Sequence, residues 1–138
     1  MRQRERIVVD TNCLISSLLL AESVPGRAVF QAVDSGLLLV SEATLFELAD
    51  VLAREKFDRY VTVEDRQQFL RVLSRVSEMI HILNPVRECR DPNDDKILEV
   101  ALNGGADLIV SGDTDLLKLH PWRGIDILSP QQYLSRRG

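Results

Sequence analysis

The stretch Arg6-Ile7-Val8-Val9-Asp10-Thr11-Asn12 places an uninterrupted aliphatic run directly before an aspartate and two small polar residues. A continuous apolar run of this length is typical of a strand buried on both faces, as in a parallel sheet covered by helices. Four further segments along the chain also have the pattern of a strand, at Leu37–Val40, Ile80–Leu83, Leu108–Val110 and Ile125–Leu128. We therefore predict five strands, the first of them at Arg6–Val9.

Longer stretches with helical periodicity separate these runs. They are predicted at about Cys13–Ala21, Gly26–Val33, from the N-cap Ser41 to Lys56, Val63–Met79, Asp94–Asn103, Leu116–Leu119 and Pro130–Arg136. Pro25 is placed to start the second of these helices, and Gly104-Gly105 to end the fifth. Ser35-Gly36 is expected to stop the second helix and form a turn, and Asn84–Asn93 is expected to be a polar loop.

Regular alternation of strands and helices predicts parallel strands joined by right-handed crossovers. The expected fold is an α/β, three-layer α/β/α sandwich with a central, mainly parallel five-stranded sheet. The chain of 138 residues fits a single domain spanning residues 1–138. In such sheets the functional crevice lies beyond the carboxyl ends of the strands, so the residues that follow each strand are the first candidates for a site.

The composition is that of a soluble globular protein, with 45% hydrophobic and 28% charged residues, which excludes an intrinsically disordered chain. Apolar stretches such as Leu18–Ala21 are far too short to cross a bilayer, and the N-terminus carries no apolar signal region. We therefore expect a cytoplasmic protein that is not inserted in a membrane.

Cysteine and histidine are too sparse for a disulfide framework or a four-cysteine zinc site. The chain has two cysteines, Cys13 and Cys89, and two isolated histidines, His81 and His120. Its net charge is −4, which counts against a protein that packages DNA or simply coats RNA. An enzyme that touches nucleic acid through metal ions remains compatible with this charge.

Acidic residues gather where the predicted strands end. Asp10 follows the first strand, Glu47 lies within two helical turns of the second, Asp94 opens the helix after the third, and Asp113 and Asp115 follow the fourth. Four carboxylates at one rim would repel one another strongly, and a divalent cation would remove that cost. Mg²⁺ and Mn²⁺ prefer oxygen ligands, so these residues predict a magnesium or manganese site.

A purely structural role is the alternative for these acids. Asp10, Asp94 and Asp113 each precede a helix, where aspartate is a favoured cap or first-turn residue. Asp94 and Asp95 are adjacent, and only one of them can face the rim. Counting towards the buried positions Ala101 and Leu102 favours Asp94, and Asp91 is an alternative cap for the same helix.

The set of motifs resembles the PIN-domain ribonucleases, and most closely the PIN-family toxin components of prokaryotic toxin–antitoxin systems. The matching segments are Asp10-Thr11-Asn12, Thr44-x-x-Glu47-Leu48, Asp91-Pro92-Asn93-Asp94-Asp95-Lys96 and the segment from Gly104 to Asp113. The resemblance extends from Arg6 to about Leu134. Each motif is weak alone, and their order and strand context make the set specific.

The resemblance implies a PIN-like fold and a metal-dependent endoribonuclease that hydrolyses phosphodiester bonds of single-stranded RNA. It implies that Asp10, Glu47, Asp94 and Asp113 are catalytic residues and metal ligands, and that Asp115 is a further ligand. It also implies supporting polar roles for Thr11, Asn12 and Ser111. Arg90 and Lys96, beside the third acid, are candidates for binding the substrate.

Partners follow from the same resemblance. They are an RNA substrate, a cognate antitoxin protein that masks the acidic rim, and a second copy of the chain in a homodimer.

Two other functions compete with the nuclease. A phosphatase-like acid-site enzyme would use Asp113-x-Asp115, but the haloacid dehalogenase-like phosphatases carry that motif on their first strand. A catalytically silent PIN-like binding module would be signalled by the loss of an acidic position, and none of the four is lost.

Overall fold

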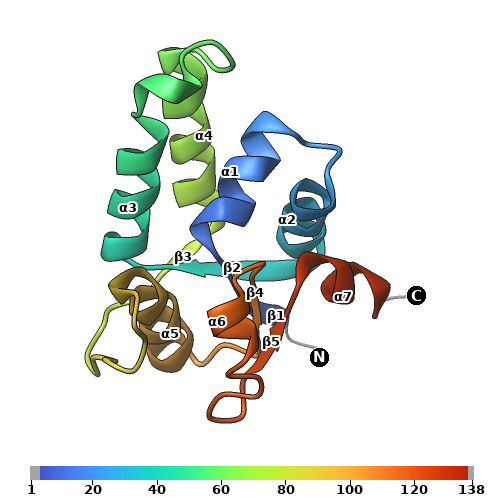
Figure 1. Cartoon of the computed structure of the whole chain (residues 1–138), viewed down its shortest axis with the longest axis vertical. Helices are drawn as coiled ribbons and strands as arrows, with labels where there is room; N and C mark the ends of the chain where they lie inside the picture. The colour runs from blue at the N-terminus through green and yellow to red at the C-terminus, as the bar shows by residue number, and fades with distance from the viewer. Residues whose placement is uncertain (1–3, 137–138) are drawn as a thin grey trace.

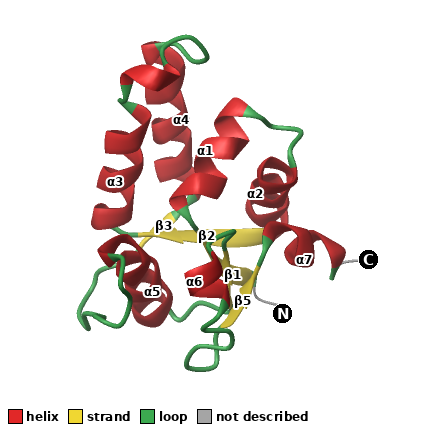
Figure 2. Ribbon diagram, viewed as in Figure 1, coloured by secondary structure: helices red, strands yellow, loops and turns green. Residues whose placement is uncertain are grey.

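Strand β1 (Glu5–Val9) lies in the middle of the sheet. In the computed structural model, which describes residues 4–136, it pairs in parallel with β2 (Gly36–Val40) on one side and β4 (Leu108–Val110) on the other. The short β3 (Glu78–Met79) and β5 (Asp126–Leu128) form the two edges. The strand order is β3-β2-β1-β4-β5 and every pair is parallel, which confirms the predicted sheet (Figure 2).

Helices cover both faces of this sheet, because successive side chains of each buried strand point to opposite sides. Ile7 and Val9 pack with one set of helices, and Val8 packs with the other. The first set is α1 (Thr11–Leu19), α2 (Val24–Ser35), α3 (Glu42–Leu52), α4 (Val63–Val76) and α7 (Pro130–Ser135). The second set is α5 (Pro92–Gly104) and α6 (Thr114–Leu117). The three-layer sandwich is therefore confirmed, with α1 to α4 above the sheet and α5 and α6 below it in Figure 1.

Small polar residues end the central strands and start the helices that follow them. Asp10 caps α1 by accepting a hydrogen bond from the Cys13 amide at 2.9 Å, and Asp113 caps α6 by accepting one from the Asp115 amide at 2.8 Å. Ser41 caps α3 in a capping box with Thr44. Because the strands are parallel, these caps lie at the same edge of the sheet, which is where a site was predicted.

The prediction of the third strand at Ile80–Leu83 was wrong. Helix α4 ends at Val76 rather than Met79, and the strand is β3, at Glu78–Met79. Glu78 forms an ion pair with Arg6 of β1 at 2.9 Å, which ties this exposed strand to the sheet. Beyond it, the amides of Leu83 and Asn84 donate to the Asn103 side chain, so the chain turns towards α5 instead of extending the sheet.

Several predicted helix ends also needed correction. Helix α3 stops at Leu52 instead of Lys56, and a single 3₁₀ turn, η1 (Glu55–Phe57), follows it. Helix α2 begins at Val24 and runs through Ser35 directly into β2, so Ser35-Gly36 forms no separate turn. A Cβ at Gly36 would lie 2.9 Å from the backbone oxygen of Glu5, so the glycine is needed for close packing rather than for turning.

The remaining corrections are small. Helix α6 begins at Thr114 rather than Leu116, and α1 ends at Leu19 rather than Ala21. The predicted stop of α5 is confirmed, since Gly105 adopts the left-handed conformation with a φ of 61° that favours glycine.

Within residues 4–136, no helix is by itself long and apolar enough to cross a membrane. Helices α1 and α2 pass that test only as a pair, by length and composition, and they are bent by 101° relative to each other.

Candidate functional site

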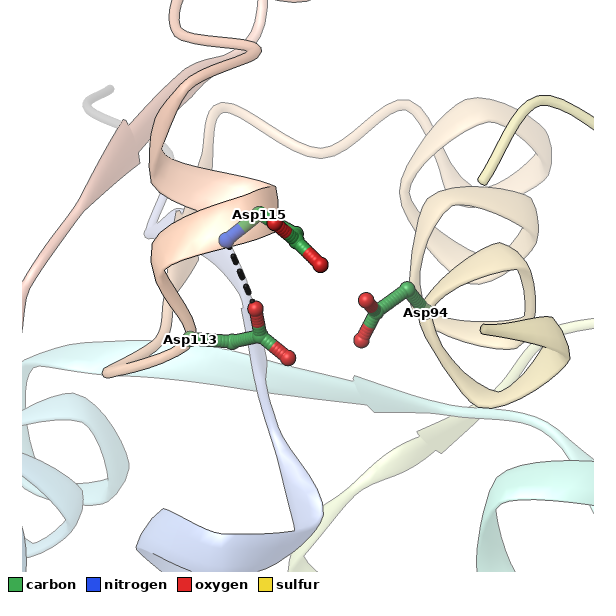
Figure 3. A group of neighbouring side chains, drawn as sticks. All are labelled: Asp94, Asp113 and Asp115. Atoms are coloured by element: carbon green, nitrogen blue, oxygen red, sulfur yellow. Dashed lines mark hydrogen bonds between the residues drawn. The ribbon is translucent and has the colours of Figure 1, made fainter. Parts of the chain in front are cut away.

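Three aspartate side chains converge at the carboxyl edge of the sheet. Asp94 comes from the first turn of α5, and Asp113 and Asp115 come from the start of α6. One carboxylate oxygen from each lies within 4.8 Å of the others. Figure 3 shows all three carboxylates pointing towards a common space between the two helices. Their oxygen-only donor set matches the ligands that hard divalent cations prefer.

Asp10 lies beside this group, and Ser111 connects the two. The buried Ser111 hydroxyl donates to Asp10 Oδ2 at 2.5 Å and accepts from the Asp113 amide at 3.0 Å. Asp10 Oδ1 is engaged by the Cys13 amide, so this carboxylate is held from both sides. Asp10 does not belong to the three-aspartate cluster, although it lines the same groove as Asp113. The ends of β1 and β4 therefore position Asp10 and Asp113 through one small hydroxyl.

The start of α5 gives its three aspartates different environments. Asp91 is the N-cap and accepts from the Asn93 amide. Asp94 is buried and faces Asp113, whereas Asp95 accepts the backbone amides of Glu88 and Cys89, both at 2.9 Å. Asp95 thus holds the preceding loop, and Asp94 is the residue that the structure brings into the acidic cluster.

Burial raises the pKa of Asp94 to about 7, and the nearby negative charge of Asp113 adds to the effect, with smaller contributions from Asp91 and Asp115. A carboxylate so placed is partly protonated near neutral pH. A bound cation would offset the repulsion between Asp94 and the neighbouring carboxylates, so Asp94 could lose this proton. The electrostatics of the cluster therefore fit a metal ion.

This pKa predicts a pH-dependent stability in metal-free buffer. The folded Asp94 keeps its proton from about pH 4 to about pH 7 while the unfolded carboxyl loses it, so stability falls as the pH rises through that window. Relative to Asp94→Asn, the wild type should lose about 1–2 kcal/mol of unfolding free energy between pH 5 and pH 8. Urea denaturation in EDTA at both pH values measures this difference. A difference that does not change with pH would contradict the prediction.

Glu47 of α3 is the remaining acid that was predicted at this edge. Its Oε2 atom is buried and has no hydrogen-bond partner among the described residues. Burial raises the pKa of Glu47, the positive charge of Lys96 opposes the shift, and the charges of Asp91 and Asp10 add to it. Glu47 is outside the three-aspartate cluster. An unpaired buried carboxylate oxygen is costly, and a cation or a water beside one would satisfy it.

The other predicted residues lie around this edge. Arg90 is highly exposed, with its guanidinium 3.7 Å from Asp115 Oδ1, and Lys96 Nζ donates to Asn93 Oδ1 at 3.1 Å. Thr11 is the first residue of α1, next to Asp10. Asn12 lines a groove of about 420 Å³ together with Asp10 and Asp113.

Two grooves border the acidic edge and include residues that sequence reasoning missed. The groove that contains Asn12 is closed by Ser129 and Gln131 at the start of α7. The second, of about 470 Å³, is lined by Phe46 and Asn93 along with Glu47 and Lys96. Ser129 follows β5 directly, so the rule that sites lie beyond strand ends would have found it. No comparable pattern pointed to Phe46.

Comparisons with known proteins agree with this architecture. A family model described as PIN domain matches residues 6–115. The uncharacterized protein MJ1680 of Methanocaldococcus jannaschii is 30% identical over 118 residues, which cover 83% of this chain and 74% of that protein.

Solved structures show the same fold at low sequence identity. A chain of VapBC2 from Rickettsia felis, solved bound to a DNA fragment from its promoter, matches with a TM-score of 0.61 and 13% identity over 90% of this chain and 98% of that one. PAE2754 from Pyrobaculum aerophilum matches with a TM-score of 0.59 and 15% identity over 96% and 88% of the two chains. VapC20 of Mycobacterium tuberculosis, described as a sarcin-ricin loop cleaving toxin, matches with a TM-score of 0.56 and 17% identity over 87% and 98%. The family model, which matches most of the sequence, shows that this chain belongs to the PIN domain family.

Proposed function

We propose that the protein is a metal-dependent endoribonuclease that hydrolyses phosphodiester bonds in single-stranded RNA. The observation that carries the proposal is the convergence of Asp94, Asp113 and Asp115 within 4.8 Å at the strand ends of a PIN domain. VapC20, a structural neighbour, is described as cleaving the sarcin-ricin loop, which supports RNA as the substrate class. A phosphatase is not proposed, because Asp113-x-Asp115 follows β4 in a PIN domain rather than the first strand.

In this proposal Asp10, Asp94, Asp113 and Asp115 hold Mg²⁺ or Mn²⁺, and Glu47 completes the acidic set. The metal, when bound, stabilises negative charge on the scissile phosphate and makes water a stronger nucleophile. Ser111 keeps Asp10 and Asp113 in fixed orientations through its two hydrogen bonds. Glu47, whose Oε2 atom has no hydrogen-bond partner among the described residues, would complete the metal shell or orient the attacking water.

Basic and small polar residues near the acids would bind the RNA backbone. The positive charge of Lys96 favours the ionised form of Glu47. The exposed Arg90 guanidinium lies 3.7 Å from the Asp115 carboxylate. Both can neutralise phosphates on either side of the cleaved bond. Thr11 and Asn12, at the start of α1, supply polar groups beside Asp10.

We further propose that the protein is the toxin of a toxin–antitoxin pair, active in the cytoplasm as a homodimer of single-domain subunits. VapBC2, one of the structural neighbours, was solved bound to promoter DNA, which supports a partner protein of the antitoxin type. Such a partner would mask the acidic edge, and a basic side chain inserted there would compensate the same charges as a metal ion.

Removal of the metal is expected to abolish activity. Purified protein should cleave a mixed-sequence single-stranded RNA with Mg²⁺ or Mn²⁺ and should lose at least about 100-fold in rate with excess EDTA, since a metal ion contributes several kcal/mol to charge stabilisation. Added Mn²⁺ should also raise the melting temperature in the absence of RNA, through preferential binding to the folded chain. Cleavage that persists in EDTA, or the absence of both cleavage and metal binding by calorimetry, would contradict the proposal.

A further inference from the structure

The groove between α3 and α5 contains an aromatic side chain that the acidic site does not use. We call it the Phe46 groove and define it by Phe46, Glu47, Arg54, Asn93 and Lys96; its volume is about 470 Å³. Phe46 is 68% exposed, and its helix α3 lies directly above α5 in Figure 1. Asp50 follows Phe46 by four residues and shares its side of α3, and Arg54 lies two residues beyond the end of that helix.

The Phe46 groove begins where the acidic cluster ends. Glu47 lines the groove, and burial together with the negative charges of Asp91 and Asp10 at the strand edge raises its pKa. Asn93 and Lys96 lie on either side of Asp94 in the sequence, in the first turns of α5. Lys96 Nζ donates a hydrogen bond to Asn93 Oδ1 at 3.1 Å. A chain of nucleotides that crosses the cluster along the start of α5 therefore also passes this groove.

The chemistry of the groove matches a nucleotide. An exposed aromatic ring offers a face on which a base of any sequence can stack, a contact used widely in single-strand binding. Lys96 and Arg54 supply positive charge for phosphates, although Glu47 and Asp50 also line the walls. The Asn93 side chain can donate to or accept from a ribose or a base edge.

A second exposed phenylalanine provides a comparison within the same molecule. Phe30 is 59% exposed and lines a groove of about 420 Å³ with Arg27 on α2. That groove contains none of the residues of the acidic edge. Phe30 and Phe46 are therefore both exposed rings in grooves that also contain a cation, and of these two only Phe46 shares its groove with a residue of the acidic edge.

We propose that the Phe46 groove binds the nucleotide next to the cleaved phosphate of single-stranded RNA, with its base stacked on the Phe46 ring and its phosphate at Lys96. The inference rests on the proposed nuclease function and adds a substrate subsite to it. Because the stack forms in the bound substrate as well as during cleavage, it affects KM more than kcat.

The test compares Phe46→Ala with Phe30→Ala in cleavage of a single-stranded RNA. Phe46→Ala should raise KM about tenfold with kcat nearly unchanged, and Phe46→Tyr should restore the wild-type value, since one base–aromatic stack is worth about a tenfold change in affinity. Phe30→Ala should behave as the wild type. Equal KM values for the two alanine variants would overturn the proposal.

A binding measurement without catalysis separates this inference from the nuclease proposal. Fluorescence anisotropy of a labelled single-stranded RNA is measured in EDTA for wild-type protein, Phe46→Ala and Phe30→Ala. A selective loss of affinity of about tenfold in Phe46→Ala supports the groove even if the wild type cleaves no RNA in the metal assay. Equal affinities of the two variants overturn it even if cleavage is found, and would direct attention to a protein as the occupant of the groove.

Discussion

Asp94→Asn is expected to reduce RNA cleavage by at least about 100-fold and to make the metal-free protein more stable. Asp94 is the most informative of the acids, because Asp10 and Asp113 are also N-caps whose replacement would mix catalytic and capping effects. Helix α5 is capped by Asp91 instead, so Asp94 can be changed without loss of a cap. The neutral amide removes a buried negative charge from beside Asp113 and keeps nearly the same shape.

The stability of Asp94→Asn should exceed that of the wild type by about 1–2 kcal/mol at pH 8 in EDTA, as measured by urea denaturation. The gain should shrink or reverse when Mn²⁺ is added, since the wild type alone binds the metal with its full set of carboxylates. A variant that loses both activity and stability would instead identify Asp94 as a structural residue.

The neighbouring residue provides the matched control. Asp95→Asn changes an adjacent carboxylate of the same helix, which accepts the amides of Glu88 and Cys89 rather than facing the cluster. It should keep wild-type cleavage and lose less than about 1 kcal/mol, because a neutral oxygen still accepts those bonds less strongly. The reverse pattern, with activity lost in Asp95→Asn and kept in Asp94→Asn, would show that Asp95 and not Asp94 belongs to the site.

Arg66→Ala is expected to lower the unfolding free energy by about 3 kcal/mol and the melting temperature by about 10 °C. Arg66 is 6% exposed, and its guanidinium donates to the Leu52 carbonyl at 2.9 Å and to the Val61 carbonyl at 2.8 Å. Leu52 is the last residue of α3, so Arg66 supplies a partner for a carbonyl that the end of the helix leaves unpaired. Circular dichroism during thermal and urea unfolding measures the loss.

Two further variants separate the causes of this effect. Asp58→Ala removes the ion-pair partner of Arg66. Because the Asp58 side chain is 63% exposed, the unfolding free energy should fall by less than about 1 kcal/mol. Arg66→Met keeps much of the aliphatic stem and should still lose about 2 kcal/mol, because the two carbonyls remain without donors. An Arg66→Met variant as stable as the wild type would show that packing alone explains the role of Arg66.

The central strands and their order in the chain were predictable because buried parallel strands consist of aliphatic runs, and polar helix caps follow them. Ile7–Val9 and Leu108–Val110 are of this kind, and they place Asp10 and Asp113 side by side. Strand β3 was misplaced because its two residues are exposed and are held by pairing to β2 and by the Arg6–Glu78 ion pair. Hydrophobic pattern carries no information about such contacts.

The acids that come together were also foreseeable as candidates, and counting along the helix favoured Asp94 over Asp95, but the contacts that hold each side chain were not foreseeable. Asp94 and Asp95 are chemically identical neighbours, and what distinguishes them is the loop amides of Glu88 and Cys89 that engage only Asp95. The Phe46 groove depends on the packing of α3 against α5, two helices about 40 residues apart, which periodicity within either helix cannot reveal.

The hydrogen bond between Ser111 and Asp10 joins residues 101 positions apart in the sequence, so during synthesis it can form only after Ser111 has been made. A ribosome makes Asp10 and Glu47 early, but any nascent chain shorter than 111 residues lacks both Ser111 and Asp113, and one shorter than 110 residues also lacks the end of β4. Strand β1 can pair with β2 first, and its other edge waits for β4. In the proposed nuclease, the three-aspartate cluster is therefore absent from the nascent chain until Asp115 has been synthesised.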